Sequence, residues 1–152
     1  MGHTRRVIPF TELGRGDVGR VGGKNASLGE LTVQLAAVGV RVPPGFATTA
    51  EAYGELFDGH ALRTRVQDQI DLLHDGVALE DVGAAIRSMI MAEPLPQELK
   101  DEIAAAYAAF ARELGRSEPD VAVRSSATAE DLPQASFAGQ RTSRPCPPPA
   151  PG

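Results

Sequence analysis

The sequence is poor in several features that would have pointed to whole classes of protein. It contains one cysteine, Cys146, so it cannot form an internal disulfide, and this favours a reducing compartment. No stretch approaches the roughly 18 consecutive apolar residues of a membrane-spanning helix. The first residues, which include Arg5 and Arg6, lack the apolar core of a signal peptide. These absences predict a cytoplasmic protein with no membrane partner.

Lysine is also scarce, because only Lys24 and Lys100 occur among the 15 basic residues. The formal net charge of -5 disfavours nucleic acid as a partner, since a phosphate backbone rewards a basic face. At 152 residues, 42% hydrophobic and 23% charged, the chain has the composition of one globular domain or of part of a larger one.

The composition changes near Gln140. Residues 141–152 hold five of the 12 prolines and no acidic residue. Such a segment cannot bury enough apolar surface to offset the entropy lost on ordering. We therefore expect a folded unit over residues 1–140 and a disordered, Pro-rich tail over residues 141–152.

Apolar residues recur at helical spacing through most of residues 1–140. Leu28, Leu31, Leu35 and Val38 would form one face of a helix that ends at Gly39. Thr48 and Glu51 have the spacing of a capping box. Helices are predicted to follow around residues 49–57, 62–73, 82–90 and 99–114, the last ending at Gly115.

Short strands are predicted where apolar residues alternate. One covers Val40 and Val42, before the turn at residues 43–45, and another covers Val121 and Val123. Three or four such strands are expected in all, so the predicted fold class is α+β, mostly helices with a few short strands and an incomplete sheet.

The first candidate site is the stretch that contains Gly22, Gly23 and Lys24. Two glycines allow a tight turn and close approach to a ligand, and the lysine stands just ahead of a helix whose free N–H groups suit phosphate. The stretch is not a P-loop, because Val18 replaces the first glycine of that motif and Asn25 follows the lysine. An ordinary helix cap with Lys24 in solvent is the alternative.

Arg124 marks a second candidate site at the end of a predicted strand. A guanidinium there can grip two phosphate oxygens, and the hydroxyl groups of Ser125 and Ser126 can add donors. The alternative is a strand-to-helix junction in which Arg124 forms an ion pair with Glu130 or Asp131.

A third stretch, residues 135–140, surrounds Phe137 with small residues and suits either a mobile flap over a ligand or a turn. The three histidines, at positions 3, 60 and 74, are scattered without metal-ligand spacing. No nucleophilic triad is indicated, so no catalytic residue and no metal ligand is assigned.

Four blocks of sequence, taken together, resemble the N-terminal part of the phosphoenolpyruvate synthase (pyruvate, water dikinase) family. They are GGKNASLGE (22–30), VPPGFATTA (42–50), VRSSATAEDLP (123–133) and ASFAGQ (135–140), in the family's order and with matching separations. Related nucleotide-binding domains occur in pyruvate phosphate dikinase and rifampicin phosphotransferase.

The resemblance implies the N-terminal lobe of an ATP-grasp-type domain with ATP as its ligand. By position, Lys24 and Arg124 match residues that contact ATP phosphates, and Gly139 and Gln140 fall in the loop that covers the nucleotide. Family members convert ATP, pyruvate and water to phosphoenolpyruvate, AMP and phosphate. The Mg²⁺ ligands, the phosphorylated histidine and the pyruvate domain of the family are expected outside this chain.

The resemblance stops at Gln140, inside the loop that covers the nucleotide. This abrupt end indicates a truncated or frameshifted gene product, which would be inactive by itself. Three alternatives stay open: a domain like that of rifampicin phosphotransferase, one like that of pyruvate phosphate dikinase, and a non-enzymatic helical interaction module.

Overall fold

The structure is a computed structural model that describes residues 5–128 and 144–145. This part of the chain is α+β and mostly helical, as the apolar spacing predicted. The elements follow one another as β1 (Val7–Pro9), the 3₁₀ helices η1 (Phe10–Glu12) and η2 (Arg15–Asp17), α1 (Val18–Val21), α2 (Gly23–Ala37), β2 (Phe46–Thr48), α3 (Ala50–Asp58), η3 (Gly59–Ala61), α4 (Leu62–Asp71), α5 (Leu79–Ala92), α6 (Gln97–Leu114), β3 (Ala122–Val123) and β4 (Arg144–Pro145).

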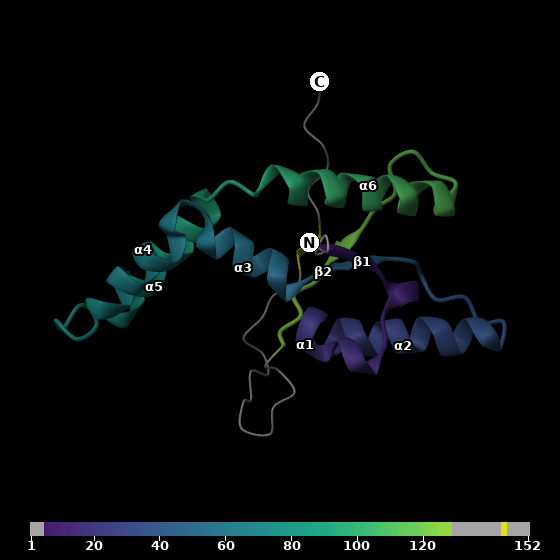
Figure 1. Ribbon diagram of the computed structural model, residues 1–152, viewed down its shortest axis with the longest axis horizontal. Coiled ribbons are helices and arrows are strands. Elements are labelled where there is room, and N and C mark those ends of the chain that lie inside the picture. The colour runs from purple at the N-terminus through teal and green to yellow at the C-terminus, as the bar shows by residue number, and fades with distance from the viewer. Residues whose placement is uncertain (1–4, 129–143, 146–152) are drawn as a thin grey trace.

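The β1–β2 pair lies between α6 on one side and α1 and α2 on the other (Figure 1). The strands are antiparallel, with Val7 opposite Thr48 and Ile8 opposite Ala47. Neighbouring side chains of a strand point to opposite faces, so Val7 and Ile8 enter two different apolar clusters. These clusters are Ile8, Leu13, Val21, Ala26 and Ala47 on one side, and Val7, Ala52 and Leu99 on the other.

Helix α2 forms where the sequence predicted a helix, but the predicted buried face is wrong. Its buried residues are small: Gly23, Ala26, Gly29 and Thr32. Leu31 is 48% exposed instead. Small side chains let the helix backbone approach η1 closely, and large leucines on that face would have held it away.

The predicted strand at Val40 and Val42 is also wrong, because the strand β2 begins only at Phe46. Its partner β1 lies opposite residues 46–48, and alternation at residues 40–42 has no strand to pair with. The cap of the next helix moves too: Thr49, not Thr48, accepts a hydrogen bond from the Ala52 N–H at 3.3 Å. Helix α3 therefore begins one residue later than the capping-box spacing predicted.

The remaining helices confirm their predictions. Leu62 of α4 is fully buried, and α4 packs on α5 in a hairpin that projects away from the β1–β2 pair (Figure 1). Helix α6 ends at Gly115, whose φ of 64° is left-handed and whose N–H caps Ala111 and Arg112. None of the helices in the described part of the chain has the length and hydrophobicity of a membrane-spanning segment.

The strand predicted at residues 121–123 is confirmed as β3, which pairs antiparallel with β4. Val123 lies opposite Arg144, and Ala122 lies opposite Pro145. At these two residues of the segment 141–152, the structure has a strand where composition predicted disorder. Backbone groups of β3 provide the pairing edge, which composition does not reveal.

Candidate functional site

Lys24 stands at the start of α2, where the sequence placed it. Gly22 separates α1 from α2, and its N–H still bonds to the Val18 carbonyl at 2.9 Å, while Asn25 donates to the Val21 carbonyl at 2.9 Å. Lys24 itself is exposed. Helix geometry leaves the first N–H groups of α2 without acceptors inside the helix, so this end has the character that anions favour.

Arg124 directly follows β3 and is exposed. The pairing of β3 with β4 holds the residue before it, Val123, at a fixed register opposite Arg144. The guanidinium therefore starts from an anchored strand end, which is the arrangement that the sequence predicted.

The structure brings these two stretches into direct contact through Gly22 and Ser126. A Cβ atom at position 22 would lie 2.3 Å from the Ser126 Oγ and 2.8 Å from the Ala127 carbonyl oxygen. Lys24 and Arg124 each lie two positions away from this contact. The segments that carry the two cations are therefore in contact with each other.

The rest of the predicted site lies outside the described residues. This holds for Gly139 and Gln140, for the stretch 135–140, and for Glu130 and Asp131, the alternative partners of Arg124. Their roles stay predictions.

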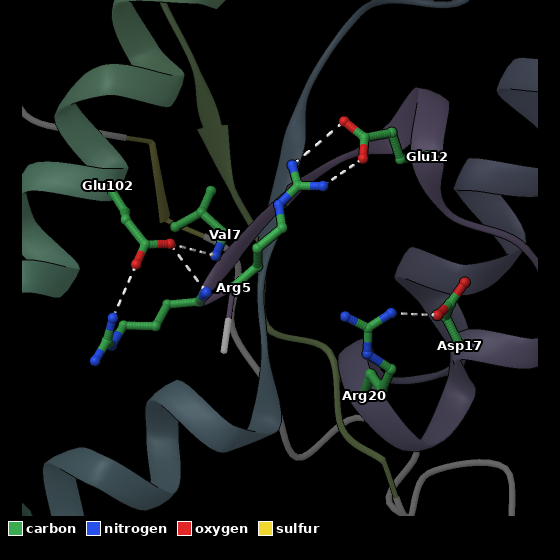
Figure 2. Close-up of polar contacts among 7 residues, drawn as sticks. Arg5, Val7, Glu12, Asp17, Arg20 and Glu102 are labelled. Atoms are coloured by element: carbon green, nitrogen blue, oxygen red, sulfur yellow. Dashed lines mark hydrogen bonds and ion pairs between the residues drawn. The ribbon is translucent and has the colours of Figure 1, made fainter. Parts of the chain in front are cut away.

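Glu102 on α6 anchors the strand that carries the first core residues. Its carboxylate accepts hydrogen bonds from the backbone N–H groups of Arg6 and Val7, at 2.9 and 3.2 Å, and from the Arg6 guanidinium at 2.9 Å (Figure 2). The same guanidinium donates to Glu55 of α3. Burial alone would raise the pKa of Glu102, but these hydrogen bonds outweigh it and the pKa is lowered.

Asp17 braces the turn that leads into α1. Its carboxylate accepts from the Gly14 N–H at 3.1 Å and from Arg20 at 2.8 Å (Figure 2). The bond from the Gly14 backbone is the larger reason why the pKa of Asp17 is lowered, followed by the bond from Arg20. Arg5 pairs with Glu12 in the same region and lowers the pKa of that carboxyl. The contacts of Asp17 therefore fix the turn that enters α1.

Sequence reasoning missed the cluster of Arg6, Glu55 and Glu102. The nearest signal was the position of Arg6 directly before the apolar pair Val7–Ile8, where a charge at the border of a buried strand needs a partner. Its partners come from α3 and α6, so only the fold shows which carboxylates they are.

A metal site is not present in the part of the chain that the structure describes. Within residues 5–128 and 144–145, no group of three or more histidine, cysteine, aspartate or glutamate residues could hold a metal ion. We therefore assign no described residue and no step to Mg²⁺.

Comparison with known proteins shows the family to which this chain is similar. Residues 18–144 match the family model described as the pyruvate phosphate dikinase, AMP/ATP-binding domain. The match includes both segments that meet at Gly22 and Ser126, and it covers most of the chain. The chain belongs to this family of nucleotide-binding domains.

Individual relatives narrow the resemblance to phosphoenolpyruvate synthases. The chain is 49% identical to the phosphoenolpyruvate synthase of Synechocystis over 144 residues and 51% identical to the one from Neisseria meningitidis over 137 residues. It is 44% identical to the phosphoenolpyruvate synthase of Escherichia coli over 142 residues. These alignments cover 91%, 89% and 92% of this chain, but only 18%, 17% and 18% of the relatives. The chain thus spans less than a fifth of the length of these relatives.

Proposed function

We propose that this chain is the ATP-binding lobe of a phosphoenolpyruvate synthase-like phosphotransferase, of ATP-grasp type. The observation that carries the proposal is the contact between Gly22 and the Ser126–Ala127 segment, because it brings the Lys24 and Arg124 stretches together. Membership of the AMP/ATP-binding domain family supports the choice of nucleotide.

In this proposal Lys24 and Arg124 bind the phosphates of ATP. The lysine adds an ammonium group to the donor end of α2, and the arginine adds a planar fork that can bind two phosphate oxygens. Together they offset charge that develops as a phosphoryl group leaves the nucleotide. Gly139 and Gln140 are proposed to cover the nucleotide, as the resemblance implies.

The proposed reaction of the whole enzyme is that of the family, from ATP, pyruvate and water to phosphoenolpyruvate, AMP and phosphate. Pyruvate, the carrier histidine and the Mg²⁺ ligands are assigned to parts outside this chain. We therefore expect the 152-residue chain to bind ATP without releasing AMP or phosphate from it.

The test is titration of the purified 152-residue chain with ATP, followed by calorimetry. Lys24→Ala should weaken binding about tenfold, the effect of losing one charge-assisted interaction. The chain offers a matched control, because its other lysine, Lys100, is exposed on α6. Arg124→Ala pairs in the same way with Arg116→Ala, an exposed arginine beyond α6. Equal affinity for Lys24→Ala and Lys100→Ala would remove Lys24 from the site.

An interaction module is the second candidate, and exposed apolar side chains favour it. Leu31, Val33, Val38 and Val40 are between 48% and 72% exposed on α2 and the turn that follows. Chromatography separates the two functions. A monomer that binds ATP supports the nucleotide-binding lobe, whereas a defined oligomer that ignores ATP supports the module.

A further inference from the structure

Gly22 has a backbone conformation that few other residues adopt. Its φ of 80° and ψ of 159° lie in a region that is essentially restricted to glycine. The residue lies between the end of α1 and the start of α2 and is itself buried. A side chain at this position would meet both an unfavourable backbone conformation and occupied space.

The occupied space belongs to the segment that follows Arg124. The Ser126 Oγ and the Ala127 carbonyl oxygen would lie 2.3 and 2.8 Å from a Cβ at position 22. A side chain can rotate away from such a contact, but a backbone carbonyl moves only if its segment moves. The Ser126 Oγ is buried and has no hydrogen-bond partner within the described residues. Its burial shows how tightly the two segments meet.

We propose that Gly22 is a positioning residue for the nucleotide phosphates. Because Gly22 has no side chain, the Ser126–Ala127 segment can pack directly against the start of α2. We call this contact of Gly22 with Ser126 and Ala127 the seat. The seat sets Arg124 beside Lys24, so that both cations act on one polyphosphate. The inference rests on the proposed function, but the seat itself can be measured without any nucleotide.

A residue that is needed only for stability would affect all nucleotides alike. A residue that aligns two cations affects ATP more than AMP, because ATP carries the additional phosphates on which two cations can act together. The ratio of the ATP and AMP affinities is therefore the informative quantity. It is measured at a temperature where every variant is fully folded by circular dichroism.

Two variants disturb the contact between Gly22 and the Ser126–Ala127 segment, one from each side. Gly22→Ala places a Cβ against Ser126 and Ala127, and its control is Gly76→Ala, where φ is 85° and a Cβ would meet nothing within 4 Å. Ser126→Leu enlarges the opposite side of the seat without altering the backbone at position 22. Its control is Ser117→Leu, at an exposed position beyond α6.

We expect both displacing variants to lower the ATP-to-AMP affinity ratio about tenfold, the size of one lost charge-assisted contact. Both controls should leave the ratio within about twofold of the wild type. A ratio that is as high in Gly22→Ala and Ser126→Leu as in their controls would overturn the proposal.

Amide hydrogen exchange of the nucleotide-free chain separates this inference from the proposed function. We expect residues 122–128 to lose protection in Gly22→Ala and to keep it in Gly76→Ala. Unchanged protection in Gly22→Ala would overturn the seat. A wild-type chain that binds neither nucleotide would refute the proposed function, and the exchange result would still decide whether Gly22 seats the Arg124 segment.

Discussion

Leu13 and Gly29 lie so close together that a Cβ atom at position 29 would lie 2.4 Å from the Leu13 Cβ and 2.6 Å from its carbonyl oxygen. We predict that Gly29→Ala lowers the free energy of unfolding by about 1–3 kcal/mol, because overpacking against a backbone carbonyl forces α2 away from its neighbour. The control is Gly54→Ala in α3, where a Cβ meets nothing within 4 Å. Gly54→Ala should stabilise by about 0.5–1 kcal/mol. Urea unfolding measures both, and the same sign for the two variants would contradict the prediction.

The carboxylate of Glu102 makes stability depend on pH. Its pKa is lowered on folding, so its contribution is present above the ordinary glutamate pKa of about 4.3 and is lost as pH falls through the folded value. We predict that Glu102→Gln has a lower free energy of unfolding than the wild type at neutral pH. Between about pH 5 and pH 3, the free energy of unfolding should fall less in the variant than in the wild type.

The control for this prediction is Glu118→Gln, at an exposed position between α6 and β3. It should follow the wild-type curve at every pH. Urea midpoints measured across the pH range test both variants. Parallel curves for the wild type and Glu102→Gln would show that Glu102 does not contribute this acid sensitivity.

Thr49 and Thr48 provide a matched pair at the start of α3. Thr49 is buried and caps the Ala52 N–H, whereas Thr48 is exposed at the end of β2. We predict that Thr49→Ala destabilises the chain by about 1 kcal/mol, and that Thr48→Ala changes stability by less than about 0.5 kcal/mol. Thermal unfolding compares them. A larger loss of stability in Thr48→Ala than in Thr49→Ala would show that Thr48 caps α3, as the sequence spacing indicated.

The buried hydroxyl group of Ser126 carries a desolvation cost. No partner for its Oγ is found within the described residues, so Ser126→Ala should leave stability unchanged or raise it by up to about 1 kcal/mol. Ser117→Ala, at an exposed site, should be neutral. A clear loss of stability in Ser126→Ala alone would show that the hydroxyl makes a hydrogen bond in solution.

The helices could be predicted where large side chains mark the buried face. Leu62, Val82 and Leu99 are buried at positions that the apolar spacing of α4, α5 and α6 selected. Helix α2 differs, because close approach to η1 requires small residues on the inner face. Gly29 and Ala26 there carry little hydrophobic signal, so the periodicity of the leucines selected the wrong face.

The short strands were harder to predict, because a strand depends on its partner. The strand β1 covers only three residues and was missed, and without it the sequence could not place β2 at residues 46–48. The sequence predicted that Lys24 stands at a helix start and that Arg124 follows a strand. It could not predict that the two stretches touch, since the contact of Gly22 with Ser126 joins segments about a hundred positions apart.

The seating of α2 has a mechanical consequence for the lysine at its tip. Lys24 is the second residue of a helix of 15 residues, a rod about 22 Å long, and the rod is held along its flank by Leu13 and its neighbours. A shift of the helix where it packs against Leu13 would also move the ammonium group of Lys24, because the helix moves as one unit. A small packing change around Leu13 would therefore move the Lys24 charge, which we propose binds the nucleotide phosphates.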